Sequence, residues 1–176
     1  MSGTDVARLL LRAFVGGTMI AHGVRHARTL DGTARWFESI GFRKPRLQAI
    51  ASAAVETGAG AALVVGAATP LAASAVVGTM GVAAGSVHLP HGFFIVDNGY
   101  EYVLNLGVAS VALAALGPGR CSVDRLLGLD KRMGGRKRAV LAASLGLAAA
   151  VAHLAAFWRP KPKAIESTEE STEATA

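Results

Sequence analysis

The sequence is poor in charge, in cysteine and in aromatic residues. Only 17% of its 176 residues are charged, whereas a soluble domain usually has about 25%. Cys121 is the only cysteine, which excludes an internal disulfide and any zinc or iron–sulfur site built from several cysteines of one chain. Aromatic residues make up 6%, so the lysines and arginines lack the interleaved rings that stack on nucleic-acid bases. With 52% hydrophobic residues and a mean hydropathy of +0.41, the composition indicates a membrane protein.

Five apolar segments predict an all-α fold, a polytopic bundle of transmembrane helices. At about 1.5 Å per residue, each is long enough for a hydrocarbon core of about 30 Å. A signal peptide is the alternative for the first segment, but it lacks a small-residue cleavage site. Small residues spaced by four, starting at Gly58 and Ala73, predict that the second and third helices pack face to face. The segments are 6–24, 47–68, 70–89, 101–117 and 139–158.

The polar side chains near these segments predict a site. A charge near the bilayer centre costs about 2.5–3.5 kcal/mol, so Glu56 needs a partner. Counting residues along the helices brings Glu56 near His22, in the half of the bundle opposite the N-terminus. Imidazoles and carboxylates in that half could bind a quinone, relay protons, or ligate a metal or haem. The candidate residues are His22, Glu56, His88, His91, Tyr100 and Glu101.

The alternative is that several of these side chains are ordinary helix-end residues. His22, His88 and His91 would then lie among wet headgroups, and Glu101 would be favoured by the dipole at a helix N-terminus. Arg12 is expected to extend its guanidinium to the membrane surface, with a carboxylate partner as the alternative. His153 receives no role.

Four short motifs follow one another in a fixed order between residue 6 and about 129: "HGVRH", "VETGAGAALVVGAATPLAA", "HLPHGFFIVDNGYEYVLNL" and "GPGRCSVD". In this order they resemble the DoxX family of small four-helix bacterial membrane proteins. The resemblance implies a redox-associated membrane subunit, since relatives include subunits of a terminal quinol oxidase and of a thiosulfate:quinone oxidoreductase. Mycobacterial relatives resemble an organiser of a membrane oxidoreductase assembly. The family pattern falls on Glu56, the Glu101 region and a structural motif of Gly117, Pro118, Gly119, Ser122 and Asp124.

The predicted domain layout follows from this resemblance and from its limits. Residues 1–129 form a DoxX-like four-helix domain, in which 25–46 is an interfacial segment with its aromatic residues at headgroup depth. A basic loop at 130–138 leads to an additional transmembrane helix at 139–158, which departs from the four-helix pattern. The polar tail, 159–176, is predicted to be disordered.

The expected function is that of a DoxX-like membrane subunit of a redox-associated complex, linked to quinone or to thiol and oxidative stress. It would anchor or organise more than catalyse, because no dinucleotide loop, cysteine pair or nucleophile with an ordered base is recognisable. One alternative is a small-molecule carrier or channel, and another is a quinone- or haem-binding electron-transfer protein. The expected partners are the bilayer and a protein of the redox complex; a homo-oligomer stays open, and nucleic acid is excluded. Catalytic residues, a metal site and the cofactor are not assigned.

The orientation in the membrane is predicted from the basic residues. The two orientations place equal numbers of lysine and arginine on the cytoplasmic side, so the count alone does not decide. The dense cluster "KRMGGRKR" and the DoxX resemblance favour a cytoplasmic N-terminus. The C-terminus and the polar site would then face outward from the bacterial inner membrane.

Overall fold

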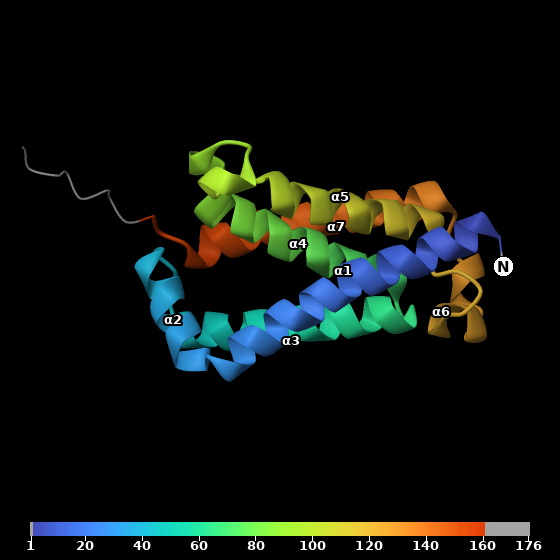
Figure 1. Cartoon of the computed structure of the whole chain (residues 1–176), viewed down its shortest axis with the longest axis horizontal. Helices are drawn as coiled ribbons and strands as arrows, with labels where there is room; N and C mark the ends of the chain where they lie inside the picture. The colour runs from blue at the N-terminus through green and yellow to red at the C-terminus, as the bar shows by residue number, and fades with distance from the viewer. Residues whose placement is uncertain (1, 161–176) are drawn as a thin grey trace, which may run out of the picture.

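The computed structural model describes residues 2–160, which form helices and connecting segments without a strand (Figure 1). The predicted all-α bundle is confirmed. The remainder of the predicted disordered tail lies outside the described residues. The helices are α1 (Gly3–Arg28), α2 (Leu30–Ser39), α3 (Pro45–Val65), α4 (Thr69–Ala83), α5 (Glu101–Leu116), α6 (Val123–Leu126) and α7 (Gly135–Phe157).

Three of the described helices are long and apolar enough to cross a membrane: α3, α7, and α4 together with its continuation to His91. This continuation is a π-helical turn at Ala84–His88 followed by a 3₁₀ turn at Leu89–His91. Helix α5 is apolar but has 16 residues. Helix α1 has 26 residues, but it carries several charged side chains. Five spans therefore stay a prediction as far as α1 and α5 are concerned.

Glycines set the two closest helix contacts. A Cβ on Gly16 of α1 would lie 2.7 Å from the carbonyl oxygen of Gly60 on α3, and α4 approaches α7 at Gly78 and Gly146 in the same way. Backbones can come this close only where side chains are absent. The prediction that the small faces of α3 and α4 meet is wrong at Gly58, which faces open space. Small residues allow a helix surface to pack closely, but the arrangement of the helices decides which neighbouring helix packs there.

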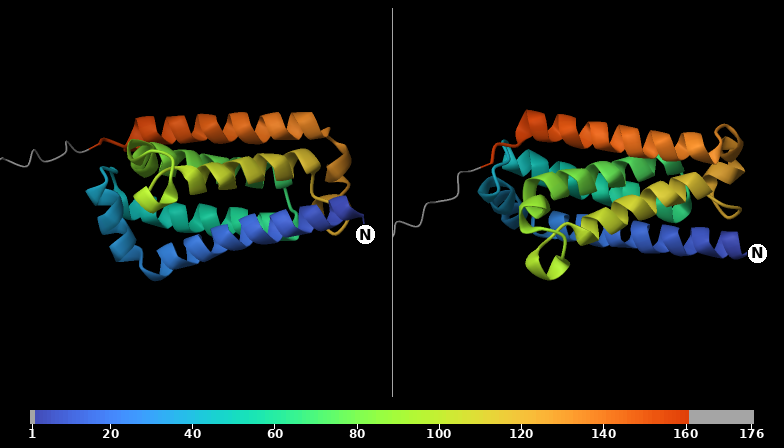
Figure 2. Two further views of the ribbon diagram at one scale, coloured as in Figure 1. Left: turned by 45° about the horizontal axis from the view of Figure 1, so that its top comes forward. Right: turned by 90° about the horizontal axis from the view of Figure 1, so that it is seen from above.

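The bundle has two parts joined by a shared core. Helices α1 and α3 pair on one side, and α4 and α5 form the middle, with α7 on the far side from α1 (Figure 2). The shared core contains Val15, Met19, Leu63, Val76 and Leu106 from four different helices. Helix α7 joins the bundle through a second buried cluster, in which its Ala142 packs with Ala73 of α4 and Ala114 of α5.

The end of α7 is tied to the segment that follows α2. The indole Nε1–H of Trp158 donates to the carbonyl of Ile40 at 2.8 Å, and the Arg159 N–H donates to Gly41 at 2.9 Å. Gly41 has φ +97°, and a Cβ there would collide with the Arg159 carbonyl. Phe37 and Phe42 are buried in this contact. That residues 25–46 lie at headgroup depth stays a prediction.

Candidate functional site

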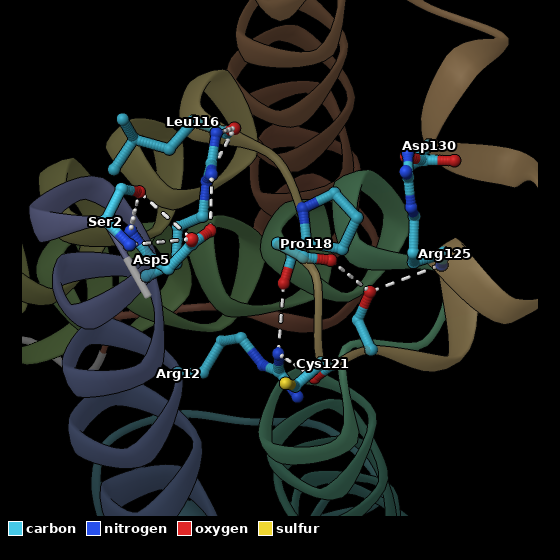
Figure 3. Close-up of polar contacts among 11 residues, drawn as sticks. Ser2, Asp5, Arg12, Leu116, Pro118, Cys121, Arg125 and Asp130 are labelled. Carbon is cyan, nitrogen blue, oxygen red and sulfur yellow. Dashed lines mark hydrogen bonds and ion pairs between the residues drawn. The ribbon is translucent and has the colours of Figure 1, made fainter.

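Arg12 is a buried arginine that joins three parts of the chain near the N-terminal end of the bundle (Figure 3). Its guanidinium donates to the carbonyls of Leu63 and Val64, at 3.0 and 2.6 Å, at the C-terminus of α3. It also donates to Pro118 and Cys121 at 3.0 and 2.7 Å. The residue is only 4% exposed, so the expectation that it extends to the surface is wrong. The reason is that unpaired carbonyls at a helix C-terminus attract a cation.

The motif "GPGRCSVD" builds this end of the bundle. Gly117 and Gly119 have φ near +84° and +85°, conformations that favour glycine, and they turn the chain so that the Pro118 carbonyl reaches Arg12. A Cβ on Gly117 would also lie 2.7 Å from the guanidinium of Arg138. The first half of the motif is therefore explained by backbone geometry.

The second half of the motif caps helices. The Asp124 carboxylate accepts hydrogen bonds from the N–H groups of Ala68 and Thr69, at 2.7 and 2.9 Å, and from the Thr69 hydroxyl at 2.7 Å. Ala68 precedes α4 and has no side chain that could cap it. The Ser122 hydroxyl accepts from the Arg125 N–H and caps α6. These contacts account for Ser122 and Asp124 as structural residues.

Outside the spans, Arg125 and Asp130 form an ion pair with a Nη1–Oδ2 distance of 2.7 Å. The hydrogen bond from Arg125 lowers the pKa of Asp130 below its ordinary value of 3.8. The pair links α6 to the turn that follows it and leads towards α7.

The two histidines between α4 and α5 bond to the backbone of their own connection. His88 Nδ1 lies 2.6 Å from the carbonyl of Asn98, and His91 Nδ1 lies 2.8 Å from that of Val87. A carbonyl can only accept, so both rings carry their proton on Nδ1. Neither ring lines the cavity described below.

Tyr100 and Glu101 complete the same connection. The Tyr100 and Glu101 N–H groups donate to the carbonyls of Gly92 and Phe93, and the Glu101 carboxylate accepts from the Ile95 N–H at 3.1 Å. The connection is thus a loop closed by its own hydrogen bonds. It displays a row of exposed apolar side chains: Leu89, Phe93, Phe94, Ile95 and Val96.

Glu56 lies elsewhere, within a polar triad on α1 and α3 in which Glu56 is buried and His26 and Ser52 are partly exposed. The Ser52 hydroxyl donates to Glu56 Oε1 at 2.5 Å, and His26 Nδ1 lies 3.0 Å from the Ser52 oxygen and 3.4 Å from Oε1. Because the hydroxyl has one proton and gives it to Glu56, the His26 ring must donate from Nδ1. Glu56 is 4% exposed, and its Oε2 has no hydrogen-bond partner among the described residues.

The structure places His26, and not His22, beside Glu56. His22 is exposed on the previous turn of α1, with its ring centroid 6.5 Å from that of His26 and 6.3 Å from that of Tyr102. His26 is not among the predicted site residues because the first apolar segment ends at residue 24, whereas α1 continues to Arg28. The spacing of Ser52 and Glu56 by one helical turn was a signal that could have revealed the serine.

A cavity of about 520 Å³ opens beside the triad. Helices α3 and α7 form its two walls, and α4 lies between them as its floor. Trp36 and Phe37 of α2 complete the lining. The lining is mainly apolar and includes Val55, Leu71 and Leu145, which are themselves exposed. The exposed side chains among the lining are thus apolar.

Few polar groups of the lining remain unused. The hydroxyls of Ser74, Thr79 and Ser86 donate to carbonyls of their own helix one turn earlier. Gln48 on α3, Trp36 on α2 and His153 on α7 also place polar side chains in the lining. Glu56 Oε2 has no hydrogen-bond partner within residues 2–160. The same range contains no group of three acidic, histidine or cysteine side chains arranged to hold a metal ion.

The fold and this cavity define a helical membrane protein with a mainly apolar pocket. Residues 7–89 match the DoxX family model, so this region of the chain is similar to the DoxX family. The matched residues include α3 and α4 with Ser52 and Glu56, whereas α7 and the "GPGRCSVD" motif lie beyond them. No curated protein and no solved structure matches the chain.

Proposed function

We propose that this DoxX-like protein is a membrane subunit of a redox-linked assembly and that it binds a lipophilic molecule of the quinone class in the cavity between α3, α4 and α7. The buried, unpartnered Glu56 Oε2 beside this mainly apolar cavity carries the proposal. A buried polar atom without a partner costs about 1–3 kcal/mol. A ligand atom that bonds to it recovers that cost.

The chemistry of the triad suits the polar end of such a ligand. Glu56 Oε2 can donate when the carboxyl is protonated and accept when it is ionised, so it can bond to a quinone carbonyl or to a quinol hydroxyl. Ser52 and His26 hold the other oxygen of the same carboxyl and fix its position. The residues thus fit the headgroup of a quinone, which would supply electron-transfer chemistry when bound.

The route of entry supports a lipophilic ligand. Exposed Val55, Leu71 and Leu145 lie at the rim of the cavity. A ligand with an apolar chain can leave this chain in the bilayer and insert only its head. A water-soluble substrate would have to cross the apolar rim, which disfavours it.

Extraction of the purified protein tests the proposal. Organic extracts of protein purified in mild detergent should contain a quinone-class lipid in stoichiometric amount by mass spectrometry. Ala149→Phe places a ring in the cavity and should remove it, whereas Ala148→Phe changes an exposed neighbour outside the lining and should retain it. Equal lipid in both variants, or none in the wild type, would overturn the proposal.

The same preparation separates the other two functions. Haem absorption bands that disappear with Ala149→Phe would instead favour a haem-binding electron-transfer protein. A polar solute held by the wild type, without any lipid, would favour the carrier. Co-purification from the native membrane tests the proposed protein partner of the redox complex.

The proposed orientation has the N-terminus in the cytoplasm. A cysteine at Gly134, in a Cys121→Ser background, should be protected from an impermeant maleimide in intact cells, and a cysteine in the tail after Pro160 should be labelled. Labelling at Gly134 with a protected tail would reverse the orientation. The Cys121→Ser change is needed because Cys121 is exposed.

A further inference from the structure

We infer that α7 supplies a second headgroup contact through His153, so that the cavity selects ligands with hydrogen-bonding atoms on two opposite edges of a ring. This inference rests on the proposed function and names the class of ligand more closely. Helix α7 lies beyond the family match, so the contact comes from the part of the chain that the family model does not cover.

The position of His153 carries the inference. Its ring lines the cavity from α7, while Glu56 lines it from α3, and α4 lies between these helices as the floor. The ring packs against Phe42 and Phe157, with centroids 5.9 and 5.2 Å away, which fixes it from the side of the bundle end. An imidazole held by aromatic packing alone still has both nitrogens available for a ligand.

The polar side chains of α4 do not compete with Glu56 and His153 for a ligand. The hydroxyls on the floor are engaged with their own helix. The other polar side chains of α3 in the lining, Gln48 and Ser52, lie on the same helix as Glu56, and His153 is the polar residue that α7 contributes. A headgroup between the walls therefore meets the polar groups of α3 on one side and the His153 imidazole on the other. A para-quinone or its quinol presents one oxygen to each wall. An alkylphenol has a single oxygen, so it can form a hydrogen bond to only one of the two walls.

The test compares a short-chain para-benzoquinone with an alkylphenol of the same chain length, using the full-length protein in lipid nanodiscs. His153→Phe keeps an aromatic ring against Phe42 and Phe157 but removes both nitrogens. It should weaken quinone binding about threefold to tenfold, the value of one hydrogen bond, and change alkylphenol binding less than twofold. His153→Gln, which restores a donor, should recover most of the quinone affinity.

Two controls make the result decisive. Val151→Phe introduces the same ring on an outer face of α7, where Val151 is 67% exposed, and should leave both affinities unchanged. Glu56→Gln should weaken both probes. If the wild type binds both probes through Glu56 but His153→Phe weakens both equally or neither, the inference fails and the proposed function stands. If the wild type binds neither probe, both the inference and the proposed function are refuted.

Discussion

Replacing Arg12 by lysine tests whether this arginine is a structural clamp. A lysine that merely extends to the membrane surface would substitute for arginine at little cost. In the structure, however, four donated hydrogen bonds join the guanidinium to α3 and to the loop after α5. An ammonium keeps the charge but donates from a single point, so it cannot reach both groups of carbonyls at once.

The expected cost follows from the bonds that are lost. Losing two of the four bonds, each contributing roughly 1.5–3 kcal/mol because the donor is charged, lowers the free energy of unfolding by about 3 kcal/mol or more. For a chain of this size, the unfolding midpoint in detergent should fall by roughly 6–12 °C. Differential scanning fluorimetry of the purified variant measures this shift.

Arg8→Lys is the matched control. Two nitrogens of Arg8 donate to one carbonyl, that of Leu116, and the third pairs with the neighbouring Asp5 carboxylate at 3.2 Å; the Arg8 side chain is 24% exposed. A lysine can serve a single carbonyl, so this change should cost less than about 1 kcal/mol. Equal midpoints for the wild type and Arg12→Lys, or equal losses for the two lysine variants, would refute the clamp.

Three further predictions concern packing, the loop and pH. Gly146→Val should lower the free energy of unfolding by about 1–3 kcal/mol because α7 touches α4 at this point, while Gly58→Val, which faces open space, should be tolerated; the reverse order would contradict the packing. His88→Ala removes a clasp of the loop and should speed limited proteolysis between residues 92 and 99, with an unchanged cleavage rate as the contrary result. The bond from Arg125 lowers the pKa of Asp130, so its stabilisation is fully present above pH 3.8 and is lost as the pH falls through the lowered pKa. The advantage of the wild type over Asp130→Asn in thermal unfolding should therefore shrink below pH 3.8, and a constant difference would contradict this.

The helical bundle could be predicted from the sequence because hydropathy and segment length are local properties. The boundaries of α3 and α4 follow from apolar runs interrupted by Pro70 and are close to the expected ones. The partners of these helices could not be predicted, because small residues such as Gly58 and Gly60 are equally frequent on several faces. Only the three-dimensional arrangement shows that Gly60, and not Gly58, meets α1.

The candidate site was predicted in part. Glu56 is buried beside a hydroxyl, as its cost in a membrane requires. The gathering of His88, His91 and Glu101 in the sequence is explained by a loop whose backbone they bond, and the structure does not bring them to Glu56. The same spacing is compatible with side chains that bind a ligand and with side chains that hydrogen-bond the loop backbone. The sequence therefore could not distinguish these two roles.

Helix α7 shows a second limit of sequence analysis. Its composition predicts a span and is correct in this respect. The four-helix pattern predicts that it is an addition to the core, and it assigns no role to His153. The structure places this helix against α4 through Gly146 and makes it a wall of the cavity. A contact between residues so far apart along the chain leaves no local pattern.

The most direct test of the ligand site is an experimental density map of the protein purified from its native membrane. The account predicts elongated non-protein density in the cavity between α3 and α7, with a polar atom about 2.5–3.2 Å from Glu56 Oε2 and an apolar chain that leaves past Val55 and Leu145. A Glu56 carboxyl turned into the acyl chains, or a cavity that holds only an acyl chain without a polar contact, would contradict it.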